Sequence, residues 1–198
     1  QCDRMDAVID FSAPASLPAL AAYVQRTGTP LVSGTTGYCD EEAARVNALG
    51  SYAPVALSAN FSIGVAVLKH LAAEAAALLP DFDIEIIETH HRMKKDAPSG
   101  TAKLLLSAVN PDGTHPTVFG REGFTPRTAG EIGVHAVRGG TVAGVHTVSF
   151  FGDEEELSLT HRAESRRIFA IGALKTAEKL KDAPVGLHTL DELLFARR

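Results

Sequence analysis

The 198 residues are enough for one or two domains with a buried core. Hydrophobic residues make up 45% and charged residues 22%, which excludes disordered and fibrous classes. The formal net charge of −5 argues against a nucleic-acid partner, and no apolar run reaches the roughly 18–20 residues of a membrane span. Cys2 and Cys39 are too few for a disulfide framework and lack metal-ligand spacing, which favours a cytoplasmic location.

Strands and helices alternate in the first third of the chain. We predict strands at 7–11, 31–33 and 54–57 and helices at 12–28 and 40–49, with Ser12 as the first N-cap. This order indicates a parallel sheet, in which ligands bind at the carboxyl ends of the strands. All three strand exits are small or polar: Asp10-Phe11-Ser12, Gly34-Thr35-Thr36-Gly37 and Ala59-Asn60-Phe61.

The chain begins at Gln1, a few residues before a strand-like run. We therefore expect sequence to be missing before Gln1, and the parallel sheet to lack its N-terminal strands.

The pattern changes from Ser62 onward. Helices are predicted at 63–79, 99–109, 166–181 and 190–195, strands at 83–89, 132–137, 142–150 and 157–161, and a loop at 110–130. Gly139-Gly140 between two strands predicts a β-hairpin. The chain is thus predicted to be α/β, with a parallel sheet, an α+β part with a mixed, mostly antiparallel sheet, and final helices that return to the first part.

The densest polar cluster runs from Glu88 to Ala102. Five basic or potentially basic side chains lie between His90 and Lys95, which suggests an anionic ligand. Ser99-Gly100-Thr101 opens the next helix, where unpaired N–H groups also favour anions. Two adjoining anion sites would suit a small dicarboxylate. The alternative is a solvated charge run followed by an ordinary helix cap.

Other motifs are less specific. His90-His91 could bind metal, but neighbours in an extended chain point to opposite faces and no third ligand is near, so we predict no metal site. Gly34-Thr35-Thr36-Gly37 is either a cofactor loop or a plain turn, and G-x-G-x-x-G is absent. Cys39 is the candidate nucleophile for a different dehydrogenase. The other histidines are interpreted as structural.

The run from Glu88 to Ala102, Glu-x-His-His-x-x-Lys-x-Asp-Ala-Pro-Ser-Gly-Thr-Ala, resembles the signature of the 4-hydroxy-tetrahydrodipicolinate (dihydrodipicolinate) reductase family of the diaminopimelate route to lysine. The resemblance covers essentially the whole chain. Its further motifs are Asp10-Phe11-Ser12-x-Pro14, Gly34-Thr35-Thr36-Gly37, Ser58-Ala59-Asn60-Phe61-Ser62, Arg121-Glu122-Gly123, Gly130-x-Ile132-Gly133, Gly144-x-His146-Thr147 and Ser165-Arg166-x-x-Phe169-Ala170.

The resemblance implies a Rossmann-like cofactor domain at 1–61, a substrate-binding and oligomerisation domain at 62–165, and helices at 166–198 that return to the cofactor domain. It implies hydride transfer from NADH or NADPH to a cyclic dicarboxylate, and a homotetramer built by the open sheet. The family's Gly-rich pyrophosphate loop is absent from this sequence, so a tetramerising substrate-binding module without turnover is the alternative.

The resemblance also assigns roles to individual residues. Lys94 would be the general acid and His90 its proton-exchange partner. The substrate carboxylates would be held by His91, Ser99, Gly100 and Thr101. The residues that would line the cofactor are Gly34, Thr35, Thr36, Ser58, Ala59, Asn60, Phe61, Arg166 and Phe169.

Overall fold

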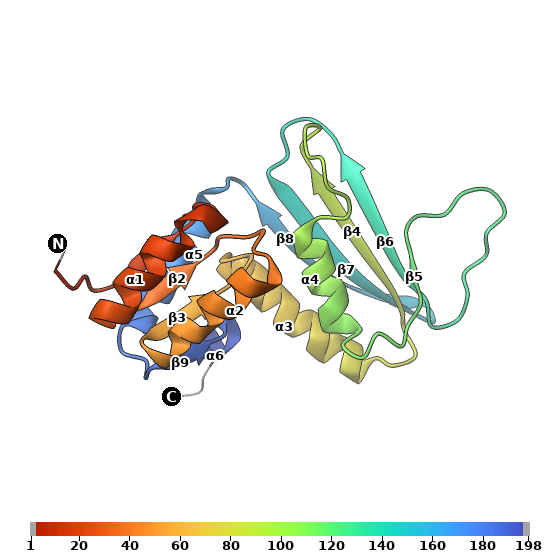
Figure 1. The fold of residues 1–198 in the computed structure, drawn as a ribbon. Coiled ribbons are helices and arrows are strands. Elements are labelled where there is room, and N and C mark those ends of the chain that lie inside the picture. Colours follow the sequence, from red (N-terminus) through yellow and green to blue (C-terminus); the bar gives the residue numbers. More distant parts are fainter. Residues whose placement is uncertain (1–2, 196–198) are drawn as a thin grey trace. The chain divides into compact units, whose positions relative to one another are not determined.

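A computed structural model describes residues 3–195, which form two compact units (Figure 1). Unit 1 contains the described residues up to Ile63 together with those from Arg167 onward. Unit 2 contains Gly64–Arg166. Within these residues no helix is long and apolar enough to cross a membrane.

Unit 1 contains a parallel sheet of four described strands in the order β1-β2-β3-β9. All three residues of β2 are buried, as expected for a parallel strand covered on both faces. One core joins the sheet to α1 and α2, and α5 packs on β1, β2 and β3. The elements are β1 (Val8–Asp10), the 3-10 helix η1 (Pro14–Ser16), α1 (Leu17–Thr27), β2 (Leu31–Ser33), α2 (Asp40–Ala48), the 3-10 helix η2 (Leu49–Ser51), β3 (Pro54–Leu57), α5 (Arg167–Leu180), β9 (Gly186–His188) and α6 (Leu190–Phe195).

The start of the first helix differs from the sequence prediction. Ser12 is not its N-cap, because the short helix η1 comes first and Ala13 occupies the cap position. The Ser12 hydroxyl instead donates to Asp10 Oδ1 at 2.5 Å, just beyond the end of β1. The prediction also missed β9, whose three residues pair with β3 from more than 120 positions later in the chain.

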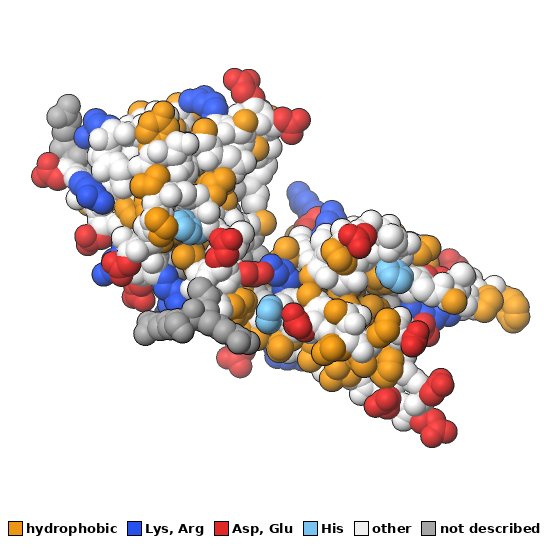
Figure 2. Space-filling model, turned by 90° about the horizontal axis from the view of Figure 1, so that it is seen from below, with side chains coloured by type: hydrophobic (Ala, Val, Ile, Leu, Met, Phe, Trp, Pro, Cys, Tyr) orange, Lys and Arg blue, Asp and Glu red, His pale blue; other side chains and the backbone are white. Residues whose placement is uncertain are grey.

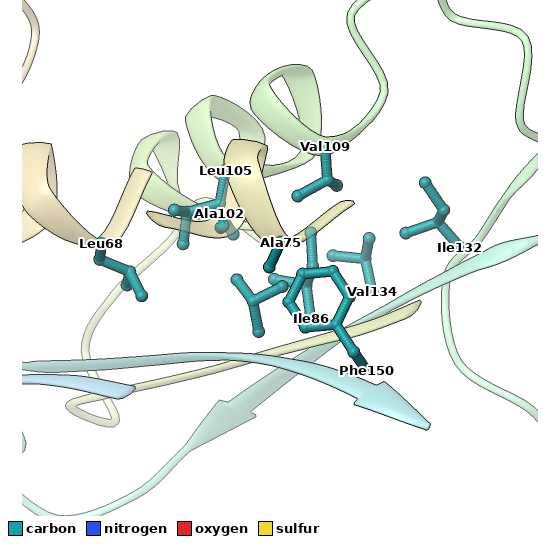
Figure 3. Close-up of a cluster of buried hydrophobic side chains, with 11 residues drawn as sticks. Leu68, Ala75, Ile86, Ala102, Leu105, Val109, Ile132, Val134 and Phe150 are labelled. Atoms are coloured by element: carbon teal, nitrogen blue, oxygen red, sulfur yellow. The ribbon is translucent and has the colours of Figure 1, made fainter. Parts of the chain in front are cut away.

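Unit 2 is a mixed five-stranded sheet in the order β5-β6-β4-β7-β8. Its core lies between one face of the sheet and two helices, and Figure 3 shows Ile86 and Phe150 of the sheet facing Ala75 and Leu105 of the helices. The α/β fold class is therefore confirmed. The elements are α3 (Ile63–Leu78), whose first residue belongs to unit 1, β4 (Asp83–His90), α4 (Gly100–Val109), β5 (Thr117–Val118), β6 (Ile132–Arg138), β7 (Gly144–Gly152) and β8 (Glu155–Ala163).

The predicted hairpin around Gly139-Gly140 is wrong. The two strands that flank it, β6 and β7, do not pair with each other, because β4 lies between them and pairs with both. The connection crosses the end of β4, where Gly139 N–H donates to the His90 carbonyl and Arg92 N–H donates to the Gly140 carbonyl. The glycines thus carry the chain over the exit of the central strand, beside His90.

Candidate functional site

Glu88 and His90 point to the same face of unit 2 because they are two residues apart on β4. Glu88 is fully buried and His90 is mostly buried. The His90 ring nitrogen Nδ1 lies 2.5 Å from Glu88 Oε2. An ionised carboxylate only accepts hydrogen bonds, so Nδ1 carries the proton that joins the two side chains.

The Glu88 carboxylate is held by two further partners. Arg138 on β6 donates through Nη2 to Oε1 at 2.7 Å and through Nη1 to Oε2 at 2.9 Å. The backbone N–H of Ser99 donates to Oε1 at 3.0 Å. Burial alone would raise the pKa of Glu88, but the hydrogen bonds from Arg138, His90 and Ser99 outweigh it and place the pKa below its ordinary value. Glu88 is therefore a buried carboxylate ion with fixed partners.

Ser99 caps α4 and connects it to β7. Its hydroxyl oxygen accepts the Ala102 N–H at 3.1 Å and lies 3.0 Å from His146 Nε2. Burial, followed by repulsion from His90, lowers the pKa of His146 to about 4, so this imidazole is neutral at neutral pH. The Ser99 hydroxyl thus accepts from Ala102 and shares a hydrogen bond with His146 Nε2.

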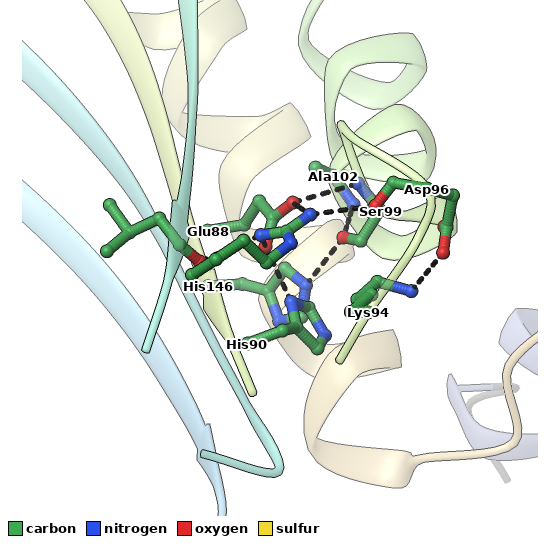
Figure 4. A network of polar contacts seen from close by, with 9 residues as sticks. Glu88, His90, Lys94, Asp96, Ser99, Ala102 and His146 are labelled. Carbon is green, nitrogen blue, oxygen red and sulfur yellow. Dashed lines mark hydrogen bonds and ion pairs between the residues drawn. The ribbon is translucent and has the colours of Figure 1, made fainter. Parts of the chain in front are cut away.

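The remaining predicted residues of this cluster are Lys94, His91, Gly100 and Thr101, of which Figure 4 labels Lys94, close to Ser99 at the start of α4. Lys94, on the loop between β4 and α4, donates from Nζ to Asp96 Oδ1 at 2.7 Å and is mostly buried. His91 follows the end of β4, and Thr101 lies in the first turn of α4. At Gly100 an added Cβ would meet no atom within 4 Å, so this turn borders open space.

The predicted cofactor residues at the ends of β1 and β2 are organised by Asp10. Its carboxylate accepts hydroxyl protons from Thr35 at 2.6 Å and from Ser33 at 3.2 Å, in addition to that of Ser12. The Thr35 oxygen also accepts the Ser12 N–H at 3.0 Å. The Thr35 side chain is thus used inside unit 1. Thr36 is exposed, and Gly37, with φ of +85°, has open space around its α-carbon.

The end of β3 is organised in a similar way. Ser58 donates to the Asn60 carbonyl at 2.8 Å, Asn60 Oδ1 accepts the Ser62 N–H at 2.8 Å, and the Phe61 ring is fully buried. Ala59 is exposed at the end of β3, whereas Gly34 is covered by the Phe11 ring, which an added Cβ would approach to 2.3 Å. Phe169 is half-buried on α5 of unit 1, whereas the exposed Arg166 is the last residue of unit 2.

Unit 2 contains a second charged cluster on the opposite face of its sheet. Glu85 accepts from His135 Nε2 at 2.6 Å and pairs with Arg121 and Arg127. Because Glu85 is three positions from Glu88 on the same strand, the two carboxylates face away from each other. Across residues 3–195 no group of three or more His, Cys, Asp or Glu side chains is arranged to hold a metal ion.

Sequence analysis did not assign roles to Glu88, Arg138 or His146, although the structure brings all three to the cluster. The spacing of Glu88 and His90 on one strand was a usable signal, since residues i and i+2 share a face. Arg138 and His146 gave no such signal, because they lie 50 and 47 positions from their partners Glu88 and Ser99.

Two family models match the chain. Dihydrodipicolinate reductase, N-terminus, matches residues 1–61, and Dihydrodipicolinate reductase, C-terminus, matches residues 64–194. The chain belongs to the dihydrodipicolinate reductase family. A 4-hydroxy-tetrahydrodipicolinate reductase of an Exiguobacterium species is 45% identical over 96% of this chain and 76% of the relative, and that of Methanocorpusculum labreanum is 44% identical over the same shares.

Solved structures agree with this assignment. A dipicolinate-bound dihydrodipicolinate reductase from Paenisporosarcina sp. TG-14 superposes with a TM-score of 0.79 at 26% identity, covering 96% of this chain and 74% of that one. An amine dehydrogenase from Mycobacterium smegmatis, at 10% identity and a TM-score of 0.56, shares the fold alone. The chain is accordingly an NAD(P)H-dependent oxidoreductase of the diaminopimelate route to lysine, and a module without turnover is not favoured.

Proposed function

We propose that this reductase binds and protonates its cyclic dicarboxylate in unit 2, at the cluster formed by Glu88, His90, Ser99 and His146. The observation that carries the proposal is that one buried carboxylate, Glu88, accepts from both His90 and the Ser99 N–H. Glu88 thereby connects the His90 imidazole to the first turn of α4, and Lys94 lies on the loop between β4 and α4. A proton donor and an anion-binding element thus belong to one site.

The substrate carboxylates bind at the start of α4. Gly100 and Thr101 present the helix N-terminus, which attracts anions through its N–H groups and dipole, and Gly100 borders open space. His91 adds a further polar group from the end of β4. Ser99 contributes by fixing this turn, because its own N–H and hydroxyl are already used by Glu88, Ala102 and His146.

Lys94 supplies the proton that completes the reduction. Hydride addition to one ring atom leaves its neighbour in need of a proton, and a positioned acid typically contributes about 10²–10⁴-fold. The Lys94 ammonium is held by Asp96, and this ion pair lowers the pKa of Asp96, so that carboxylate stays ionised beside it. His90 exchanges protons with Lys94 through Nε2, since Nδ1 is bound to Glu88.

NADH or NADPH supplies the hydride when bound to unit 1. The residues there fit such a group, because the strand ends expose backbone at Ala59 and an uncrowded glycine at Gly37. The Thr35 and Phe61 side chains are engaged internally, so these two residues contribute their backbone. The residues we place at the cofactor are Gly34, Thr35, Thr36, Ser58, Ala59, Asn60, Phe61, Arg166 and Phe169.

We further propose a cytoplasmic homotetramer. Among the described residues, the helices that cover the unit 2 sheet lie on the face of Ile86. On the opposite face, the exposed fractions of Ile87, Val137 and Phe151 are 41%, 48% and 39%. Hydrophobic side chains also gather on the part of unit 2 seen in Figure 2. Sedimentation of the wild type and of Val137→Glu tests the assembly, which the charge should weaken.

The substrate site is tested with Thr101→Val. Loss of the hydroxyl should raise KM for the substrate about tenfold, as expected for one lost hydrogen bond to a charged group, and leave KM for the cofactor unchanged. Titration with pyridine-2,6-dicarboxylate, monitored by calorimetry, should show the same loss of affinity. An equal rise in both KM values would contradict the placement of the carboxylates at α4.

A further inference from the structure

We propose that Glu88 is a positioning residue for this reaction. Whenever the His90 imidazole carries a single proton, the Glu88 carboxylate holds it as the Nδ1–H tautomer, and it ties that ring to the substrate-binding turn of α4. This inference rests on the proposed function, because it concerns how the proton-exchange partner of Lys94 is oriented.

The geometry of the His90 ring supports this role of Glu88. Nδ1 is occupied by Glu88 Oε2 at 2.5 Å, which leaves Nε2 as the ring nitrogen that Glu88 does not engage. An added Cβ at Gly144 would lie 3.1 Å from Nε2, so the absence of a side chain there keeps space beside this atom. The ring also packs edge-to-face on His146, with centroids 5.1 Å apart. The ring orientation is therefore fixed by Glu88 and His146.

Glu88 itself cannot turn away from His90. Both of its oxygens are bound by Arg138, and Oε1 also accepts the Ser99 N–H. A fully buried carboxylate with fixed donors is a rigid acceptor. When such an acceptor binds one ring nitrogen of a histidine, it determines which of the two nitrogens carries the proton.

The Glu88 carboxylate also serves both halves of the site. Oε2 accepts from His90, and Oε1 accepts from the residue that caps α4. Displacement of Glu88 would therefore disturb the proton relay and the carboxylate-binding turn together. The charged and titratable groups around His90 are Glu88 on β4, Arg138 on β6, His146 on β7, and Lys94 with its partner Asp96 on the intervening loop.

The decisive variant is Glu88→Gln. The single amide oxygen will accept from Arg138 and the Ser99 N–H, so the amide NH₂ will face His90 Nδ1 and favour the Nε2–H tautomer. We expect kcat to fall about 10–100-fold, the usual cost of losing an orienting partner, with KM for the cofactor unchanged. Long-range ¹⁵N–¹H spectra of histidine-labelled protein should show the Nδ1–H tautomer of His90 in the wild type at alkaline pH, and its reversal in the variant.

Glu85→Gln is the matched control. Glu85 is also held by a histidine and by arginines, but on the opposite face of the same strand. This variant should keep kcat within about twofold, since it changes no group near His90. If it lowers kcat as much as Glu88→Gln, the effect is general destabilisation and the proposal fails.

Two further measurements cover the remaining outcomes. If Glu88→Gln does not fold, the double variant with Arg138→Met removes the unpaired guanidinium and should fold with kcat still reduced; a normal kcat would overturn the proposal. The wild-type spectrum needs no substrate, so an Nε2–H tautomer there overturns the inference alone. A wild type without reductase activity would instead overturn the proposed function.

Discussion

Two carboxylates organise the two units of this protein in different ways. In unit 1, half-buried Asp10 gathers hydroxyl donors from Ser12, Ser33 and Thr35 at the ends of two strands. In unit 2, fully buried Glu88 gathers a guanidinium, an imidazole and a backbone N–H. The hydroxyl protons around Asp10 are all bound by its carboxylate. Glu88, by contrast, binds only Nδ1 of His90 and does not engage Nε2.

This difference follows from the strength of the donors. A fully buried carboxylate needs strong hydrogen-bond donors to remain ionised, and Arg138, His90 and the Ser99 N–H supply them. Hydroxyl donors suffice for a carboxylate that water reaches. We therefore expect substitutions in unit 2 to affect catalysis, and substitutions around Asp10 to affect cofactor binding.

The largest expected effect is that of Lys94→Ala. Removing the ammonium should lower kcat about 10²–10⁴-fold, because the acid acts only in the transition state. Cofactor affinity, measured by titrating NADH and following its fluorescence, should be unchanged. A near-normal kcat would show that the proton has another source.

A strong effect on stability is expected for Gly172→Ala in unit 1. A Cβ at this position on α5 would lie 1.7 Å from the backbone carbonyl oxygen of Phe61, which cannot give way as a side chain could. We expect about 3 kcal/mol of destabilisation or more, measured by urea unfolding. In the control Gly139→Ala of unit 2 the new Cβ meets nothing within 4 Å, and stability should barely change. Intact binding of pyridine-2,6-dicarboxylate by Gly172→Ala would show that the damage is confined to unit 1.

The buried imidazole of His146 predicts a pH dependence of stability. Its pKa is about 4 in the folded protein against an ordinary 6.5, so between these values the unfolded chain binds a proton that the folded one does not. The free energy of unfolding should therefore fall as pH drops below 6.5, by about 1.4 kcal/mol per pH unit from this group, and this loss should end near pH 4.

His146→Gln isolates that contribution, because glutamine can still bond the Ser99 hydroxyl without titrating. Urea unfolding between pH 4 and 7 should give a shallower slope for the variant than for the wild type. Equal slopes would mean that folding does not lower the pKa of His146.

The smallest effect is expected for Asp10→Asn. An amide oxygen can accept fewer of the three hydroxyl protons, each net hydrogen bond contributes about 0.5–1.5 kcal/mol, and the site is partly exposed. We expect a destabilisation of about 1–2 kcal/mol, a severalfold weaker affinity for NADH, and unchanged binding of pyridine-2,6-dicarboxylate. Weakened binding of both ligands would contradict the separation of roles between the two carboxylates.

Local patterns in the sequence were sufficient for much of the fold and of the site. The alternation of strands and helices indicated the parallel sheet, and the run from Glu88 to Ala102 predicted the candidate site, because strand exit, loop and helix start are contiguous there. Motifs along the whole chain also resembled the family that the comparisons then showed. These features depend on residues that are close in the chain.

The tertiary structure alone decided the pairing of distant segments. Gly139-Gly140 looked like a hairpin turn, but β4 occupies the position between β6 and β7, and β9 joins β3 from the far end of the chain. The same pairing brings Arg138 and His146 to Glu88 and Ser99. Such contacts reflect the packing of the whole sheet rather than any local preference. The sequence by itself therefore predicted the candidate site residues, and only the folded chain identified what holds them in place.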